Sequence, residues 1–578
     1  MWPEILPGPV ACAPRRCRKT DVRTRIAPLV RGQDVRLLAV SATTGVVVAM
    51  IVALFDALTV EVIYEWLLDQ ELSVQAAAPF LGAVGAVLLL RYGGFNAGAS
   101  TSDEYVRAFH ERSPSIPLRE VPGKLAAGIT TIGLGGAVGL EGPSIYAGSA
   151  LGLSMNSRLG RWLQRDEAKV LMTAGAAAGV AAVFKAPATG VMFAMEAPYR
   201  EDVTPHALLP SLLAAASSYA TFVALVGTEP VVPLLDQESS SLLAVQAVDL
   251  LGALLLGIGA GLGGRGFAWL VRRAKVLGKD LPVFRRLLIG GGTLAALAVA
   301  SHEAFGESLT LGPGTDSMAW VVDDRTLSLI ALLFVLRIVA TAATLVAGGV
   351  GGLFIPLATL GVVMGEFVGE ALGEGETILY PILGLAAFLG AGYRAPIAAV
   401  MFVAESTGGV GSFVVPALVA AAVSQLVAGP SSVADHQHQH RLGYLERRFT
   451  LPLSSILSTD VLTVPPDATV SEFVYFHVLA RRERIVPVVD GGAYVGMARL
   501  DDISELDRDA WENLTIADVM ATELPTARPS WTLRDAVVAM ETSGTDLIAV
   551  TDAEGTFIGL VAEEDIVKLD EILDETGA

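Results

Sequence analysis

Charged residues are scarce in this sequence, at 17% of 578 residues, whereas about a quarter of a typical soluble protein is charged. The scarcity is confined to one part of the chain. Residues 451–578 hold 25 Asp and Glu against 8 Lys and Arg, so most of the net charge of −20 lies in this segment. The remainder is nearly neutral and rich in Gly, Ala, Leu and Val. This division predicts a chain with one part in lipid and one part in water.

Cysteine is nearly absent, because only Cys12 and Cys17 are present, too few for a disulfide framework. The apolar block contains no cysteine and no His-Glu-x-x-His motif, and its His110, His206 and His302 have no partner motif. An intramembrane protease or lipid transferase would need a nucleophile with its base, or a set of metal ligands, in this block. We therefore expect no enzyme activity, no metal site, no required cofactor and no nucleic acid partner.

Residues 1–34 form a basic tail, and the first apolar run begins only near residue 37. This run starts too late and continues too far for a simple cleaved signal peptide. A basic excess before the first span places the N-terminus in the cytoplasm. The basic residues are Arg15, Arg16, Arg18, Lys19, Arg23, Arg25 and Arg31.

Residues 35–430 contain many apolar runs, and several are shorter than the ~20 residues of a simple spanning helix. Gly and Pro interrupt them, which predicts helices that end inside the membrane. Residues 135–143 resemble residues 348–356 at an offset of 213, and residues 185–196 resemble residues 394–405 at an offset of 209. Two motif pairs in the same order predict two homologous halves, approximately 35–228 and 240–430. Paired broken segments of this kind indicate a binding site near the midplane.

Glu141 lies in the run Gly139-Leu140-Glu141-Gly142-Pro143, inside the apolar block. A carboxylate in a membrane is costly, so it indicates a functional site. Pro143 fits the first turn of a helix, and a helix N-terminus offers free N–H groups and partial positive charge to an anion. The second half repeats the motif without a carboxylate and offers the N–H groups of Leu353 and Phe354. We expect an anion to bind between two opposed helix N-termini. Helix dipoles rather than a full positive charge would hold it, so it would bind strongly enough to enter and weakly enough to leave.

Gly-x-Glu-Gly-Pro followed by Gly-x-Phe-x-Pro resembles the CLC family of chloride channels and chloride/proton exchangers, over residues 35–430. The resemblance implies an α-helical polytopic membrane domain with two inverted-topology halves and broken helices. It also implies a homodimer in the cell membrane and chloride as the transported ion, with other halides and nitrate left open. Glu141 would be the gating glutamate. The chloride-binding residues would be Ser100, through its hydroxyl, and Gly142, Leu353, Phe354 and Ile355, through their backbone.

Two departures from the family bear on the mechanism. Proton-coupled members usually carry a glutamate just after the position of Glu196, and this sequence has Ala197 there. We therefore expect channel-like chloride transport, with an antiporter using an atypical proton path through Glu141 and Glu196 as the alternative. The family's pore tyrosine falls near Ala434, and the next tyrosine is Tyr444. Either another group closes the inner side of the central anion site, or that side is more open. A CBS-containing cation transporter is a remote alternative, because it would need more clustered carboxylates.

The C-terminal region repeats at an offset of 63 and resembles a soluble α/β tandem CBS module, with the first motif at 451–510 and the second at 511–578. We expect this module in the cytoplasm. Nucleotide-binding CBS motifs use a Gly-x-x-Thr/Ser-x-x-Asp run, and here the aspartates remain while the hydroxyls are missing. Arg499, Asp502 and Asp565 are therefore candidate contacts for an adenine nucleotide, and a purely dimer-stabilising module is the alternative. Residues 431–450, with their alternating His and Gln, are expected to be a solvated linker rather than a metal site.

Overall fold

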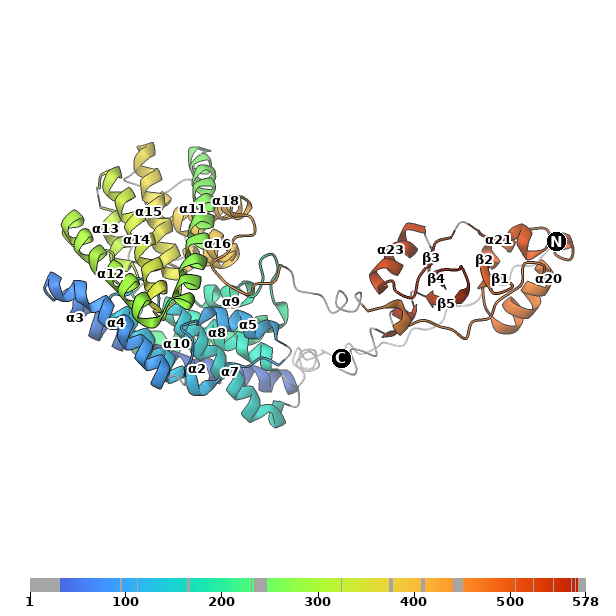
Figure 1. The fold of residues 1–578 in the computed structure, drawn as a ribbon, viewed down its shortest axis with the longest axis horizontal. Helices are drawn as coiled ribbons and strands as arrows, with labels where there is room; N and C mark the ends of the chain where they lie inside the picture. Colours follow the sequence, from blue (N-terminus) through green and yellow to red (C-terminus); the bar gives the residue numbers. More distant parts are fainter. Residues whose placement is uncertain are drawn as a thin grey trace, which may run out of the picture. The chain divides into compact units, whose positions relative to one another are not determined.

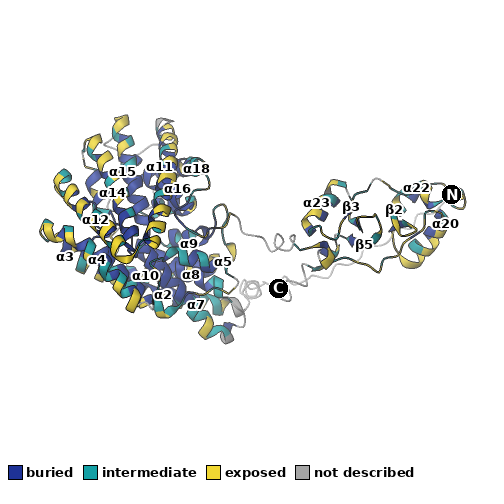
Figure 2. Cartoon of the chain, viewed as in Figure 1, coloured by how far each residue is buried: buried dark blue, intermediate teal, exposed yellow. Residues whose placement is uncertain are grey.

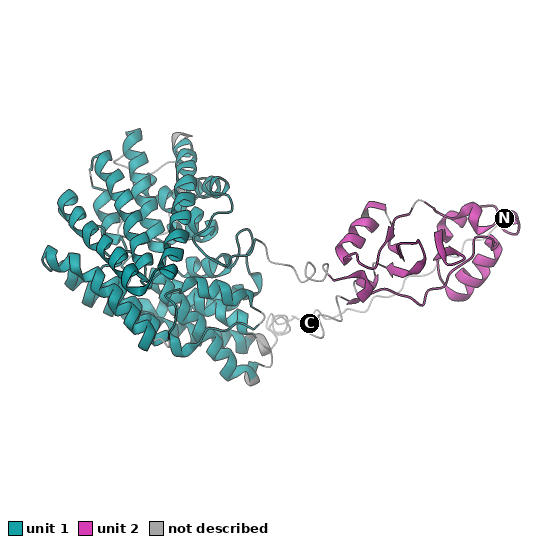
Figure 3. Cartoon of the chain, in the orientation of Figure 1, with its two compact units in different colours: residues 1–441 teal, residues 442–578 magenta. Residues whose placement is uncertain are grey.

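The computed structural model describes residues 32–569, apart from gaps at 94–95, 112, 164–166, 230, 233–246, 324, 374–377, 407–410, 440–450, 505, 523, 544, 563 and 567. The chain divides into two compact units, Met1–Arg441 and Leu442–Ala578 (Figure 3). Cys12, Cys17, the basic residues up to Arg31, and Tyr444 lie outside the described residues. The boundary between the two units lies inside the expected linker at 431–450.

The first half of unit 1 is helical throughout its described secondary structure (Figure 1). Its first helix continues directly into a π-helical stretch, η1. The elements are α2 (Gly32–Asp56), η1 (Ala57–Tyr64), α3 (Glu65–Leu68), α4 (Leu72–Tyr92), α5 (Ser102–His110), η2 (Leu118–Glu120), α6 (Val121–Gly133), α7 (Glu141–Leu163), α8 (Ala168–Phe184), α9 (Pro187–Glu196), η3 (Pro205–Ala207) and α10 (Leu208–Val226).

The second half of unit 1 follows the same plan and begins with the longest helix. Its elements are α11 (Ala247–Asp280), α12 (Val283–Phe305), α13 (Thr315–Val321), α14 (Leu327–Ala347), α15 (Phe354–Leu372), α16 (Leu379–Tyr393), α17 (Pro396–Ser406) and α18 (Gly411–Ala428). The predicted offsets recur in the helix boundaries. From α7 to α15 the helix start moves from residue 141 to 354, and from α9 to α17 it moves from 187 to 396.

Seven helices among the described residues are long and apolar enough to cross a membrane. Several of them carry leucines on an exposed face, such as Leu81, Leu209 and Leu262. In contrast, α8 is buried along every side chain from Leu171 to Phe184, and α16 is buried along its whole length. Figure 2 shows these buried helices inside unit 1 and the exposed faces at its periphery. Outward apolar side chains are expected where lipid is the solvent, so the chain is a multi-pass membrane protein.

Glycines bring neighbouring helices into backbone contact in the centre of each half. A Cβ atom on Gly148 of α7 would overlap the carbonyl oxygen of Gly175 in α8, and the reverse substitution would do the same. Gly361 of α15 and Gly384 of α16 form the equivalent pair in the second half. Small residues permit this close approach where there is no hydrophobic drive between helices in lipid. The two halves therefore repeat a packing contact as well as a sequence motif.

Unit 2 consists of two small α/β repeats. In the first repeat, β1 (Ile485–Asp490) and β2 (Ala493–Arg499) pair antiparallel, and in the second, β4 (Leu547–Thr551) and β5 (Phe557–Ala562) do the same. A short strand, β3 (Thr526–Ala527), pairs parallel to β4. The repeats join through bridges between Met497 and Ala521 and between Ala493 and Thr556. The remaining helices are η5 (Leu453–Ser455), α20 (Val470–Phe473), η6 (Val474–Leu479), α21 (Leu500–Ser504), η7 (Arg508–Ala510), α22 (Ile516–Val519) and α23 (Leu533–Ser543).

The expected solvated linker over 431–450 is wrong for residues 432–434 and Gln437, whereas His436, His438 and Gln439 are exposed. Ser432, Val433, Ala434 and Gln437 are buried in unit 1, each at most 7% exposed. Backbone bonds also hold this segment, because the N–H of Arg200 donates to the carbonyl of His438 at 2.9 Å. We call residues 432–439 the strap. A polar sequence packs here because its amides and carboxylates find partners in unit 1, which composition alone does not reveal. Residues 440–450 of the expected linker lie outside the described residues.

Candidate functional site

The site forms where the two halves meet through the loops that precede α7 and α15. Gly139 and Gly352 lie in these loops and exchange two backbone hydrogen bonds, of 2.9 and 2.7 Å between N and O. These residues are separated by the offset of 213 that relates the halves. Their antiparallel bridge brings the first residues of α7 and α15, Glu141 and Phe354, to one place. The prediction that a helix begins at each Gly-rich motif is therefore confirmed.

Two threonines brace the loops in the same reciprocal way. The hydroxyl of Thr344 accepts the N–H of Ala137 at 3.0 Å, and the hydroxyl of Thr131 accepts the N–H of Val350 at 3.1 Å. Each threonine belongs to one half and the amide that it binds belongs to the other. Buried backbone amides need such partners. The loops are thus fixed from both sides, and the helix N-termini that they lead into are fixed with them.

The side chain of Glu141 is fully buried at this junction. Its Oε1 accepts the N–H of Phe354, the first residue of α15, at 2.5 Å. Its Oε2 has no hydrogen-bond partner among the residues that the structure describes. Gly139 and Gly352 leave room for the carboxylate, since a Cβ on either residue would overlap one of its oxygens. A carboxylate of one half therefore occupies the helix N-terminus of the other, where a mobile anion would find the same N–H donor.

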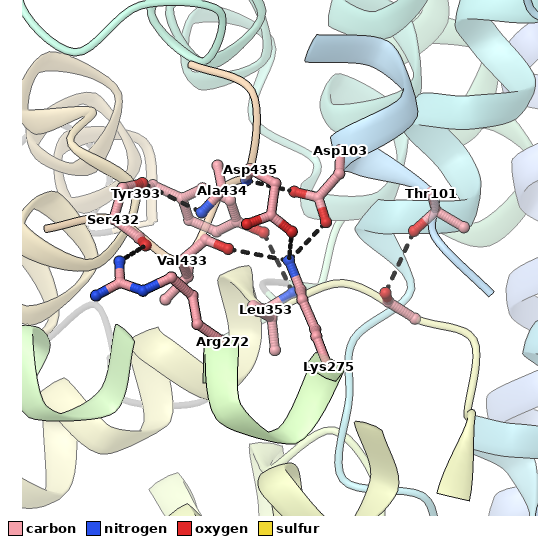
Figure 4. A network of polar contacts seen from close by, with 11 residues as sticks. Thr101, Asp103, Arg272, Lys275, Leu353, Tyr393, Ser432, Val433, Ala434 and Asp435 are labelled. Carbon is pink, nitrogen blue, oxygen red and sulfur yellow. Dashed lines mark hydrogen bonds and ion pairs between the residues drawn. The ribbon is translucent and has the colours of Figure 1, made fainter. Parts of the chain in front are cut away.

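A tyrosine also lies at this junction, although not at the position near Ala434 where the family pattern places one. The hydroxyl of Tyr393, the last residue of α16, accepts the N–H of Leu353 at 3.2 Å (Figure 4). Tyr393 is 2% exposed. Sequence analysis missed this residue, although it directly precedes the repeated Arg394-Ala395-Pro396 motif. The N–H groups of Leu353 and Phe354, both predicted anion contacts, are thus occupied by a phenol and a carboxylate.

The loop before α5 supplies a third group of polar atoms. The carbonyl of Ser100 accepts a hydrogen bond from Lys124 Nζ at 2.6 Å, and this buried ammonium also lies 3.8 Å from the centre of the Tyr146 ring. The adjacent hydroxyl of Thr101 donates to the carbonyl of Gly351 at 3.3 Å. A Cβ on Gly142 would overlap that hydroxyl. The structure therefore brings the hydroxyl of Thr101, which sequence analysis did not single out, against the predicted contact at Gly142.

Ile355, the last of the predicted backbone contacts, lies in the first turn of α15. Its carbonyl accepts a hydrogen bond from the hydroxyl of Thr359 at 2.9 Å. The side chain of Ile355 is 3% exposed and belongs to the core of unit 1.

Glu196 and Glu405 form a second reciprocal pair between the halves. The carboxylate of Glu196 accepts the N–H groups of Ile397 and Ala398 at 3.2 and 2.7 Å, at the start of α17. The carboxylate of Glu405 accepts the N–H groups of Ala188 and Thr189 at 2.7 and 2.8 Å, at the start of α9. Each caps a helix N-terminus that belongs to the other half.

In the C-terminal module, the predicted nucleotide contacts bind each other in part. Arg499 donates from Nε and Nη2 to the two carboxylate oxygens of Asp502, both at 2.8 Å. This bidentate pair lowers the pKa of Asp502, first through its hydrogen bond. Asp565 accepts the N–H of Ala562 at 3.3 Å. Asp502 thus takes two of the five N–H donors of Arg499, so a phosphate would bind through the other donors or displace the carboxylate.

These features define a class of protein: a polytopic helical membrane protein in which two repeated halves bring helix N-termini together around a buried carboxylate. Residues 81–429 match the model of the family described as voltage gated chloride channel, and residues 453–509 and 516–571 match the CBS domain. The chain belongs to the voltage gated chloride channel family and carries tandem CBS domains.

Relatives share about a quarter of their residues with this chain. The putative chloride channel protein ClcB-like of Ralstonia nicotianae is 27% identical over 345 residues, which cover 57% of this chain and 76% of that protein. The H(+)/Cl(-) exchange transporter ClcA of Vibrio cholerae is 29% identical over 345 residues, which cover 57% of this chain and 70% of that protein.

Two solved structures share the fold. A slow cyanobacterial Cl−/H+ antiporter gives a TM-score of 0.60 at 20% identity, covering 68% of this chain and 94% of that one. A CLC-type fluoride/proton antiporter gives a TM-score of 0.60 at 23% identity, covering 71% of this chain and 100% of that one. The expected fold class, with its helical membrane domain and CBS module, is confirmed.

Proposed function

We propose that this chain moves chloride across the cell membrane along a path between the N-termini of α7 and α15, and that Glu141 gates this path. The observation that carries the proposal is the hydrogen bond of 2.5 Å between Glu141 Oε1 and the N–H of Phe354. A chloride ion and a carboxylate cannot use this donor at the same time. When the side chain turns away, an anion takes its place at the helix N-terminus, held by N–H groups and the helix dipole.

Chloride moves down its own gradient in this proposal, in a channel-like mode. Ala197 supplies no carboxylate, and the neighbouring Glu196 already binds two backbone N–H groups of α17. Glu196 is therefore a helix cap, and it has to break these bonds before it can carry a proton. Chloride/proton exchange is the second candidate, favoured by relatives that are named H(+)/Cl(-) exchange transporters.

The test is chloride efflux from proteoliposomes with simultaneous recording of external pH. Wild type is compared with Glu141→Ala and Glu141→Gln, and with Glu366→Gln as a matched control at a buried glutamate of α15. We expect chloride efflux without proton movement, changed rate and anion affinity in both Glu141 variants, and wild-type behaviour in the control. Protons driven uphill by a chloride gradient, and lost in Glu141→Ala, would establish exchange instead. If no halide moves, the proposed function is wrong.

The remaining parts of the proposal concern assembly and the C-terminal module. We propose a homodimer with the N-terminus and the CBS module in the cytoplasm. Chemical cross-linking in the bilayer tests the dimer, and labelling of single introduced cysteines from each side of the membrane tests the orientation. The CBS module is a candidate adenine-nucleotide site through Arg499, Asp502 and Asp565. Calorimetric titration of the full chain with ATP and AMP, compared with Arg499→Gln, tests this role. Absence of a binding heat in wild type would leave the module a dimer-stabilising part, and equal heats in wild type and variant would exclude Arg499 as a contact.

A further inference from the structure

Lys275 of α11 forms a cluster with two carboxylates beside the candidate site (Figure 4). Its Nζ lies 2.6 Å from Asp103 Oδ2 and 3.1 Å from Asp435 Oδ2, and it also donates to the carbonyl of Val433 at 3.1 Å. The side chains of Lys275 and Asp103 are only 18% and 14% exposed. An ammonium has three N–H donors, and each of them has a partner here. No donor of Lys275 is left for a transported anion.

The cluster ties together three segments that are far apart in the sequence. Asp103 lies in the first turn of α5, Lys275 in the last turns of α11, and Asp435 in the strap. The second oxygen of Asp103 accepts the N–H of Asp435 at 2.9 Å. One turn before Lys275, Arg272 donates to the carbonyl of Ser432 at 3.1 Å. The strap is thus fixed to α11 at two points and to α5 at one.

These contacts lead directly to the polar groups of the anion site. Ser102 and Thr101 immediately precede Asp103, and the hydroxyl of Thr101 donates to the carbonyl of Gly351 at 3.3 Å. The strap also holds the backbone at Tyr393, because Gln437 Nε2 donates to its carbonyl at 3.0 Å. The same strap therefore fixes both the start of α5 and the tyrosine whose hydroxyl binds Leu353.

The charge of the cluster argues for a role in geometry rather than in anion binding. Two carboxylates and one ammonium leave a net negative charge, which repels an anion. Both oxygens of Asp103 are bonded, as are all donors of Lys275. Lys275 and Asp103 are largely buried, while Asp435 is 36% exposed. A cluster that is saturated in this way holds its members in one arrangement, and removal of one member leaves uncompensated charge.

We propose that Lys275 is a positioning residue for anion transport: through Asp103 and Asp435 it sets the places of the α5 N-terminus and Tyr393 relative to the N-terminus of α15. This inference rests on the proposed function. Without the ammonium, the two carboxylates repel each other and the strap separates from α5. The anion then loses well-placed donors, while Glu141 and its contact with Phe354 remain.

The experiment measures chloride efflux of the full-length chain in proteoliposomes as a function of chloride concentration. We expect Lys275→Met to raise the half-saturating chloride concentration by about tenfold or more, since displacements near 1 Å have effects of this size. The maximal rate should change far less. Lys275→Arg should restore most of the affinity. Lys279→Met is the matched control, because Lys279 lies one turn further along α11 with an exposed side chain.

A triple variant, Lys275→Met with Asp103→Asn and Asp435→Asn, keeps the test valid if Lys275→Met fails to fold, because it buries no unpaired charge. We expect it to fold and still to show the raised half-saturating concentration. Wild-type affinity in the triple variant, or in a folded Lys275→Met protein, would overturn the inference. A fall in maximal rate at unchanged affinity would overturn it as well. The proposed function fails separately, if wild type moves no chloride or Glu141→Ala changes nothing.

Discussion

Replacing Gly352 with alanine should displace the carboxylate of Glu141 without removing it. A Cβ at Gly352 would overlap Glu141 Oε1 and would lie 2.7 Å from Glu141 Cγ. The three nearest atoms to this Cβ all belong to the Glu141 side chain. The backbone of Gly352 is not in the left-handed region, so alanine can adopt its conformation. The strain therefore falls on one side chain, which can rotate away.

The size of the effect follows from the contact that is lost. Carbon atoms in contact lie about 3.5–4.0 Å apart, so Cγ must retreat by about 1 Å. The bond of 2.5 Å between Oε1 and the N–H of Phe354 then lengthens to about 3.5 Å, beyond hydrogen-bond range. A hydrogen bond to a charged group contributes about 1.5–3 kcal/mol. Its loss should shift the competition between carboxylate and chloride by about 10- to 100-fold in favour of chloride.

The assay is chloride binding by calorimetry, together with chloride efflux from proteoliposomes. Gly352→Ala should bind chloride more tightly and release it faster at neutral pH than wild type. Gly266→Ala, at a helical glycine with open space around it, is the matched control. In a Glu141→Ala background the Gly352 substitution should have no further effect, because the clashing atoms are gone.

Two results would refute this reasoning. One is a folded Gly352→Ala protein with wild-type chloride affinity and efflux. The other is an equal effect of Gly352→Ala with and without Glu141, which would show that the substitution acts through the loop backbone. Either result would mean that Glu141 does not compete with chloride for the N–H of Phe354.

Three further predictions concern other contacts. Tyr393→Phe should raise the half-saturating chloride concentration by about 2- to 10-fold, because the anion loses the phenol O–H, which can donate while the phenol oxygen accepts the N–H of Leu353; unchanged affinity would place the anion elsewhere. Glu196→Gln and Glu405→Gln should each lower the free energy of unfolding by about 1–3 kcal/mol, since each weakens a charged cap; thermal unfolding in detergent measures this, and equal stability of all three proteins would contradict it. Burial, followed by the charge of Arg481, lowers the pKa of His477 below its usual value of 6.5. The unfolded state therefore binds the proton more readily than the folded state, and the CBS module should lose stability as the pH falls below 6.5. Hydrogen exchange of the module in the full-length chain should show this loss in wild type and a smaller one in His477→Gln.

The sequence was sufficient to predict the features that depend on local rules. A proline in the first turn marks the start of α7 and of α15, and the repeated motifs identify the halves at offsets that the helices reproduce. Glu196 and Glu405 could be expected to meet backbone N–H groups, because a carboxylate at a matched helix end needs donors. In each case the residue and its environment lie within one motif or its repeat.

Other contacts join residues that are far apart in the sequence, and no local pattern predicts them. Lys275 lies in a long helix and meets Asp103 and Asp435, which are 172 and 160 residues away along the sequence. The strap looks like a polar linker because its side chains are polar, yet the amide of Gln437 is buried in unit 1 and the carboxylate of Asp435 pairs with Lys275. Tyr393 was missed because the family pattern directed attention to Ala434. Tertiary partners, rather than composition, decide whether such residues are buried.

The reciprocal contacts between the halves have a consequence for biogenesis. Among the described residues, the amides of Ala137, Ala188 and Thr189 in the first half donate to Thr344 and Glu405 in the second. During synthesis the first half therefore enters the bilayer with these donors unsatisfied and must wait for more than 200 residues before the partners emerge. A nascent chain that stops after the first half is left with amides that lipid cannot satisfy, so quality-control proteases should remove it.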